Sequence, residues 1–278
     1  MRSVDPDYSQ WLLQVGNGSI SNDNGLGEDI LEIPPQYLCG SNLVTDIFGE
    51  DLENIDIKSF SSRAILCPKN DDVDKVNDEV ITKLPGDIKT YYSTDEADCT
   101  NPADANNYPV EFLNTIRASG LPPHNLKLKV NTIVILLRNL NTKRGLCNGT
   151  RLIVKELQQN IIVAEVITGS GIGDIVLIPR IICTNIGNDI PFTLKRRQFP
   201  VQPAFAMTIN KAQGQTLDKV GVLLPEPVFG HGQLYVAFSR VRRASDLKIK
   251  IFVGPCQGNL VKDSDKVFTQ NVVYREVL

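Results

Sequence analysis

Within the first 90 residues, the apolar and polar positions predict a strand that is followed directly by a helix. Residues 64–68 are a short apolar run stopped by proline, which predicts a buried strand. Apolar residues then recur at helical spacing over 73–84, in a helix that Asn70 or Asp71 would cap and Pro85-Gly86 would end. A strand that runs into an amphipathic helix is the repeating unit of an α/β sheet.

Shorter elements surround this unit. The pattern predicts two helices before it, at 8–15 and 42–52. After it, the pattern predicts a strand at 91–92 and a helix at 109–118, which Gly120 would end.

From residue 126 the pattern changes to strand-like runs that follow each other without helices. The runs cover residues 126–130, 133–137, 151–157, 161–167 and 175–182. Turn-forming residues such as Asn148-Gly149 separate them. Five such strands predict a small β-barrel inserted into the α/β framework, with an antiparallel edge on the main sheet as the alternative.

The α/β pattern returns after the basic run 195–197. It predicts strands over 201–207, 219–224 and 247–252, with a helix over 231–240. The expected fold class is therefore α/β, with a mostly parallel sheet, flanking helices and a small β insertion.

Composition and charge narrow the class of protein. The 278 residues are 42% hydrophobic and 22% charged, which is typical of a globular protein, and no apolar run could span a bilayer. Residues 1–120 carry 22 acidic and 8 basic side chains, whereas residues 121–278 carry 10 and 21. We therefore expect no membrane partner, and we expect any contact with a polyanion in the second part.

The cysteines and histidines do not indicate a metal site. The six cysteines are scattered singly, no two of them at a CxxC spacing, and the chain has only two histidines. A structural zinc site needs four clustered ligands, so we expect no bound metal. Single thiols of this kind are typical of an intracellular protein with reduced cysteines.

Residues 206–216 are the first candidate for chemistry. A predicted strand ends there in a polar turn, and Thr208, Asn210 and Lys211 offer hydrogen-bond donors. Gly214 would let the backbone approach a ligand closely. The segment is a candidate phosphate-binding turn.

Residues 233–243 are the second candidate. Apolar residues on the predicted helix leave Arg240 at the end of a largely buried element, where a guanidinium can be aimed at a phosphate. The alternative is a helix C-terminus whose basic residues complement its dipole. For Arg242 and Arg243, that alternative or a contact with nucleic-acid phosphates is favoured.

Taken together, these two segments resemble motifs V and VI of superfamily-one DNA helicases, in the version found in the Pif family and in Helitron transposon helicases. The resemblance extends to other segments in the same order: 1–3 (motif IV), 11–18, 64–70 with 73–77, and 138–141 with 145–152. It covers residues 1 to about 253.

The resemblance implies a second RecA-like domain that carries an inserted SH3-like barrel. Its expected parts are a helical linker from a first RecA-like domain (1–60), the second RecA-like domain (61–125 and 190–254), the barrel (126–189) and a tail (255–278).

The resemblance also implies roles for single residues. Arg240 and Arg2 correspond to arginines directed at the ATP γ-phosphate, where such groups stabilise developing charge. Gln213 and Gly214 correspond to the turn near the nucleotide. Thr208, Asn210 and Lys211 correspond to the part that holds the single-stranded DNA backbone. Many family members have histidine at the position of Asn210 and serine at that of Ala212.

A helicase of this type also needs a P-loop, and no glycine in this chain is followed by lysine. We therefore expect ATP and Mg²⁺ to be bound mainly by a first RecA-like domain upstream, and the chain alone not to hydrolyse ATP. The expected partners are that domain and single-stranded DNA. The chain is expected to be monomeric, with the nucleus favoured over the mitochondrion.

Three functions stay open at this point. The leading one is a 5′-to-3′ DNA helicase of the Pif type. The second is a non-enzymatic module, a transposon remnant that holds single-stranded DNA or a protein. The third, a peptide-binding barrel, is disfavoured because residues 126–182 contain no Trp or Tyr to form an aromatic groove.

Overall fold

The structure is a computed structural model, and it describes residues 5–20, 26–27, 29–52, 57–118, 120–185, 190–274 and 276. The chain divides into two compact units. We call Met1–Val80 with Phe205–Leu278 the parallel-sheet unit, and Ile81–Ala204 the inserted unit. No helix in the described part of the chain is long and apolar enough to cross a membrane.

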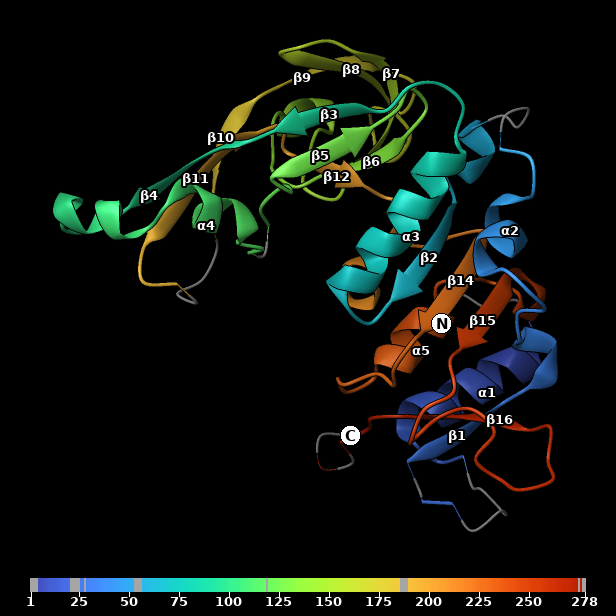
Figure 1. The fold of residues 1–278 in the computed structure, drawn as a ribbon. Helices are drawn as coiled ribbons and strands as arrows, with labels where there is room; N and C mark the ends of the chain where they lie inside the picture. Colours follow the sequence, from blue (N-terminus) through green and yellow to red (C-terminus); the bar gives the residue numbers. More distant parts are fainter. Residues whose placement is uncertain are drawn as a thin grey trace. The chain divides into compact units, whose positions relative to one another are not determined.

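Four parallel strands form the centre of the parallel-sheet unit, in the order β13-β2-β14-β15 (Figure 1). The elements that this unit contributes in chain order are α1 (Pro6–Asn17), β1 (Ile30–Ile33), η1 (Pro35–Tyr37), α2 (Leu43–Phe48), η2 (Ile57–Phe60), β2 (Arg63–Cys67), α3 (Asn70–Lys83, which contains the boundary), β13 (Ala206–Thr208), η5 (Ile209–Ala212), β14 (Lys219–Leu224), α5 (Gln233–Phe238), η6 (Ala244–Asp246), β15 (Leu247–Ile251) and β16 (Val267–Gln270). The predicted parallel α/β sheet is thus confirmed.

Both faces of this sheet are covered, as a parallel sheet requires. On one face, buried side chains of α1, α5, β2, β14 and β15 form a single hydrophobic cluster. On the other face, α2 packs closely on β14. A Cβ added at Gly221 would lie 2.9 Å from Ile47 Cγ1, so this position leaves no room for a side chain.

The first and last segments of the chain are part of this unit. Strand β1 pairs with β16 in antiparallel register, and the sequence pattern predicts neither strand. The Tyr8 hydroxyl on α1 donates to the Phe238 carbonyl on α5 at 2.8 Å, and Trp11 stacks on the Phe238 ring at 5.3 Å. The segments expected to be a linker (1–60) and a tail (255–278) therefore contain elements that pack on the sheet and on α5.

In its described residues, the inserted unit contains three antiparallel sheets, with strand orders β12-β6-β7-β8-β9, β3-β5 and β10-β11-β4. Its elements are β3 (Lys89–Tyr92), β4 (Thr94–Asp98), η3 (Pro102–Asn107), α4 (Val110–Thr115), β5 (Asn125–Leu128), β6 (Ile133–Leu136), η4 (Thr142–Arg144), β7 (Arg151–Leu157), β8 (Ile161–Val166), β9 (Ile175–Pro179), β10 (Ile181–Thr184), β11 (Thr193–Gln198) and β12 (Val201–Pro203).

Two expectations about this unit need correction. The predicted single strand 175–182 is two strands, β9 and β10, which belong to different sheets. Pro179, which lacks an N–H, ends β9, and the Arg180 guanidinium turns over the Phe199 ring at 4.8 Å. Residues 81–125, expected in the second RecA-like domain, belong instead to the inserted unit, in which β3 and β4 pair with β5 and β11.

An antiparallel edge on the main sheet, the alternative for the five predicted strands, is not formed in the described residues. The five-stranded sheet of the inserted unit shares no strand with β13-β2-β14-β15.

A buried ion pair organises the three-stranded sheet. The Arg196 guanidinium on β11 contacts the Asp95 carboxylate on β4 at 2.6–3.1 Å, and both side chains are at most 2% exposed. The same guanidinium donates to the carbonyls of Leu113, Ile116 and Pro122, in and after α4. One side chain therefore ties α4 and the segment after it to the sheet.

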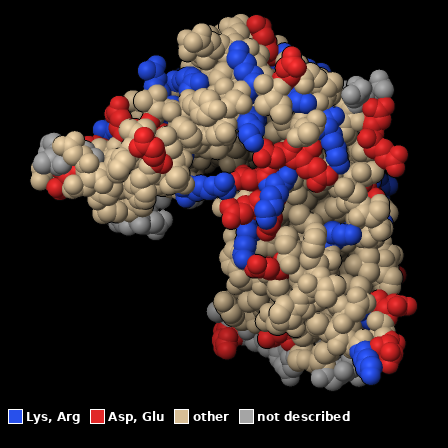
Figure 2. Space-filling model, in the orientation of Figure 1, with Lys and Arg blue, Asp and Glu red and all other residues tan. Residues whose placement is uncertain are grey.

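The two compact units differ in charge from the two parts of the sequence, residues 1–120 and 121–278. The parallel-sheet unit has 22 acidic and 15 basic residues, and the inserted unit has 10 and 14. Basic and acidic side chains are interspersed on the visible face (Figure 2). The basic second half of the chain is thus divided between the units, and an anion contact on the parallel-sheet unit must rely on local cations rather than on its net charge.

Candidate nucleotide and DNA site

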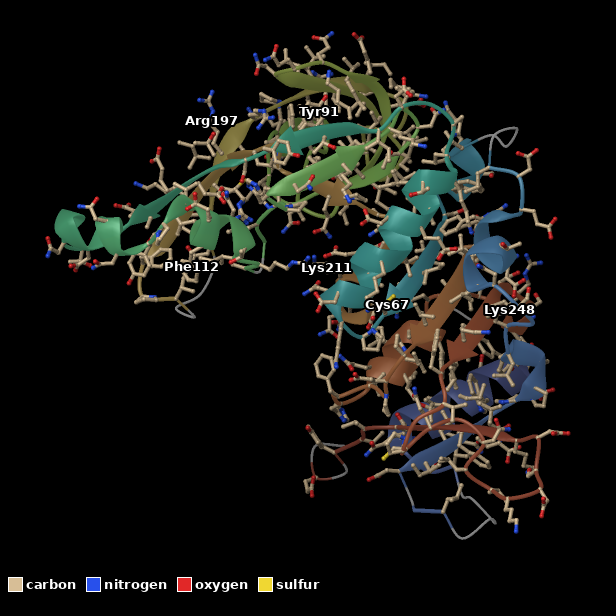
Figure 3. All side chains as sticks on the ribbon, viewed as in Figure 1. Cys67, Tyr91, Phe112, Arg197, Lys211 and Lys248 are labelled. Carbon is tan, nitrogen blue, oxygen red and sulfur yellow. The ribbon has the colours of Figure 1, made fainter. Side chains whose placement is uncertain are left out.

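The candidate site lies at the carboxyl edge of the parallel sheet, where α/β proteins place their ligands. Thr208 is the last residue of β13 and pairs with Cys67, the last residue of β2. Figure 3 labels Cys67 and Lys211, which both belong to this unit. Burial raises the pKa of the Cys67 thiol to about 12, so this thiol is a packing group and not a nucleophile.

Strand β13 is held at this edge by an asparagine. The Asn77 side chain on α3 donates to the Ala206 carbonyl at 3.2 Å and accepts from the Ala206 N–H at 2.8 Å. Because β13 is an edge strand, the amide takes the place of a neighbouring strand. The sequence pattern assigns Asn77 no functional role, although a polar residue on the apolar face of a predicted helix is a signal for such a contact.

The turn η5 presents its polar side chains because its apolar ones are buried. Ile209 and Ala212 are fully buried, whereas Asn210 and Lys211 are exposed. Desolvation lowers the pKa of the Lys211 ammonium from its ordinary value, and the Asp74 carboxylate acts in the opposite direction.

The exposed residues Gln213 and Gly214 continue the turn. Gly214 has φ +82°, a conformation that L side chains rarely adopt, and a Cβ added there would meet nothing within 4 Å. The requirement for glycine is therefore one of backbone conformation and not of space. The open position is compatible with the close backbone approach expected from the sequence.

Arg240 joins the two candidate segments directly. Its Nη1 donates to the carbonyls of Gln215 at 2.8 Å and Ala212 at 3.3 Å, and its Nε donates to the Val236 carbonyl at 2.7 Å. The Arg240 carbonyl accepts from the Leu217 N–H at 2.9 Å. The guanidinium, expected at a phosphate, here contacts main-chain oxygens of the turn after β13 and of α5.

The other arginines differ from Arg240. Arg242 and Arg243 are exposed, and Arg243 forms an ion pair with Asp246 at 3.0 Å. Arg240 itself lies just after α5 and donates to the Val236 carbonyl of that helix, as a basic residue at a helix C-terminus can do. Arg2 lies outside the described residues.

Gln233 forms a second link between the segments. Its side chain is 4% exposed, and its Oε1 accepts from the N–H groups of Phe229 and Gly230, both at 3.1 Å. Its Nε2 donates to Asn210 Oδ1 at 3.3 Å. The sequence places Gln233 within the second segment but gives it no role, because the contact with Asn210 depends on tertiary structure.

We expect Gln233→Ala to lower the free energy of unfolding of the parallel-sheet unit by about 2–3 kcal/mol, because it leaves two main-chain N–H groups without their acceptor. Urea denaturation would measure the change. Gln14→Ala, on the exposed face of α1, is the matched control and should change the stability by less than about 0.5 kcal/mol. Equal effects of the two substitutions would contradict the role of Gln233.

Within the described residues, no three side chains of His, Cys, Asp or Glu come together in a group that could hold a metal ion.

Comparison with known proteins identifies the relatives of this chain. Residues 111–157 match the model of the DNA helicase Pif1 2B domain. The human ATP-dependent DNA helicase PIF1 is 33% identical over 188 residues, which are 67% of this chain and 27% of the human protein. The Campylobacter jejuni Pif1 is 26% identical over 230 residues, which are 78% of this chain and 48% of that protein.

Solved structures show the same fold. A Bacteroides Pif1 helicase in complex with ADP-AlF3 and single-stranded DNA has a TM-score of 0.59 and 23% identity, over 91% of this chain and 51% of that one. The Candida albicans Pif1 helicase has a TM-score of 0.59 and 21% identity, over 90% of this chain and 54% of that one.

This chain spans about a quarter of the human protein and about half of the solved chains. Over that portion, its sequence is similar to Pif1 DNA helicases, and its parallel sheet has the RecA-like fold of the solved Pif1 structures.

Proposed function

We propose that this chain supplies the part of an ATP-dependent 5′-to-3′ DNA helicase that grips single-stranded DNA and responds to ATP. The observation that carries the proposal is the direct hydrogen bonding between the turn after β13 and Arg240, at the carboxyl edge of the parallel sheet. A single side chain thus contacts both the segment proposed to hold DNA and the helix α5. The ATP-dependent helicase reaction is inferred from the similarity of the chain to human PIF1.

The DNA contacts proposed for this unit are to the backbone. Thr208, Asn210 and Lys211 present a hydroxyl, an amide and an ammonium on one short turn, and Arg242 and Arg243 add exposed guanidinium groups. Such donors bind phosphates of any sequence, and their affinity falls with salt. The Bacteroides relative with single-stranded DNA supports this choice of ligand.

ATP, with Mg²⁺, would be bound mainly by a first RecA-like domain, and Arg240 and Arg2 would stabilise charge on its γ-phosphate. Gln213 and Gly214 would lie near the nucleotide. If Arg240 turns towards a phosphate, its Nη1 would give up the carbonyls of Ala212 and Gln215. We propose that this exchange of partners links the nucleotide state to the shape of the DNA-binding turn.

We also propose that the inserted unit forms an SH3-like barrel from the five-stranded sheet and the β3-β5 pair. One hydrophobic cluster supports this proposal, because it contains buried residues of both sheets. Its members include Tyr91, Leu126 and Leu128 from β3 and β5, and Leu152, Ile162 and Val176 from the larger sheet. A barrel of this kind would help to hold the DNA strand.

The proposed function can be tested in a chimera, in which this chain replaces the matching portion of human PIF1. The chimera is expected to hydrolyse ATP, and single-stranded DNA is expected to stimulate the hydrolysis. A folded chimera that binds single-stranded DNA without stimulated turnover would favour the non-enzymatic alternative.

A further inference from the structure

The loop between β14 and α5, residues 225–232, carries a large apolar side chain in solvent. Phe229 is 60% exposed, although the preceding Val228 is 3% exposed and belongs to the main core cluster. Among the described residues, Phe229 takes part in no ring contact, whereas the nearby His231 stacks on Tyr274 at 5.4 Å. The Phe229 ring therefore contributes little to the packing of the unit.

The backbone of this loop is nevertheless fixed. The buried Gln233 Oε1 accepts the N–H groups of Phe229 and Gly230, and the Gly232 N–H donates to the Val272 carbonyl at 3.0 Å. At the other end of the loop, Glu226 forms an ion pair with Lys69. An exposed aromatic ring on a fixed backbone loses little conformational entropy when it binds a ligand.

The loop is also joined to the turn proposed to hold DNA. Gln233, which holds the Phe229 backbone through Oε1, donates to Asn210 Oδ1 through Nε2. Asn210 precedes Lys211, whose ammonium is available to a phosphate. One buried side chain therefore places an exposed aromatic ring near a set of phosphate-binding groups, which is the combination that binds single-stranded nucleic acid without sequence preference.

We propose that Phe229 stacks on a base of the single strand whose backbone is held by Thr208, Asn210 and Lys211. This inference rests on the proposed function, since it needs the strand at that turn. The ligand is any base of single-stranded DNA, because every base offers a π face. Gln233 is then the positioning residue that sets the ring relative to the backbone contacts.

The test compares binding of the full chain to oligo(dT) and to an oligomer of equal length with abasic sites, by fluorescence anisotropy at low salt. Phe229→Ala is expected to weaken binding of oligo(dT) by roughly 5- to 100-fold and to leave binding of the abasic oligomer unchanged. Phe229→Trp should retain the affinity for oligo(dT). Lys211→Ala should weaken the binding of both oligomers alike, because it removes a phosphate contact.

Phe252→Ala is the matched control. Phe252 is 51% exposed in the same unit, but it follows β15, at the opposite edge of the sheet from β13. Its substitution should leave both affinities unchanged. Unchanged binding of oligo(dT) by Phe229→Ala would overturn the stacking assignment alone and would leave Phe229 as a contact for a protein. Failure of the wild-type chain to bind either oligomer would overturn the proposed DNA grip, and the stacking assignment with it.

Discussion

Arg240→Ala in the chimera with human PIF1 is expected to lower the DNA-stimulated turnover of ATP by roughly 10³-fold or more. An arginine that stabilises the charge of a transferring phosphoryl group accounts for roughly 10³- to 10⁵-fold in the turnover of GTPases. Arg240→Lys should restore only a small part of the rate, since an ammonium is a point charge without the planar fork of N–H donors that a guanidinium presents. Steady-state ATPase kinetics with saturating single-stranded DNA would measure both effects.

The contacts of Arg240 in this structure require a control for folding. The guanidinium donates hydrogen bonds to the carbonyls of Ala212 and Gln215. Arg240→Ala could therefore lower the turnover by disturbing this turn alone. The melting temperature and the DNA affinity of the variant separate a structural role of Arg240 from a catalytic one. A purely structural role would lower both in proportion to the turnover. Lys266→Ala, which removes an exposed cation of the same unit, should leave the turnover unchanged. Equal turnover of Arg240→Ala and the wild type would refute the assignment.

Arg196→Met is expected to lower the free energy of unfolding of the inserted unit by about 3–5 kcal/mol. The substitution leaves the Asp95 carboxylate buried and without its counterion, and it removes the donor to three carbonyls near α4. Urea denaturation, followed by a probe in the inserted unit, would measure the loss.

Two further variants test the cause of that loss. Lys195→Met, at the adjacent position of β11, breaks an exposed ion pair with Asp98 and should cost less than about 1 kcal/mol. The double variant Asp95→Leu with Arg196→Met removes both charges and should recover part of the loss, because no charge stays buried alone. A loss below about 1 kcal/mol in Arg196→Met would show that the pair does not organise this sheet.

The elements that sequence patterns predict well contain a short run of buried apolar residues. The predicted bounds of β7 and β14 agree with the structure, because each strand contains such a run. The sequence pattern shows β11 only as part of a basic run, since its buried Arg196 has no apolar signature. The sequence pattern does not predict strands β1 and β16, because each is stabilised by a partner more than 200 residues away in the chain.

The features of the candidate site also divide into those that the sequence predicts and those that it does not. The turn after β13 and the segment around Arg240 could be found from their residue types, because phosphate-binding groups and a glycine with positive φ leave a local trace. The contacts of Arg240 with Ala212 and Gln215 could not, since main-chain carbonyls are present at every position. The role of Gln233 depends on the distance between two loops, which only the fold determines.

Binding of the full chain to oligo(dT) as a function of salt tests the central claim most directly. The account predicts that the affinity falls linearly on a log–log scale, and that Lys211→Ala makes the slope shallower by about 0.7, the value for one phosphate contact on a single strand. A wild-type chain that does not bind oligo(dT) at low salt, or a slope that Lys211→Ala leaves unchanged, would contradict a DNA grip at the turn after β13.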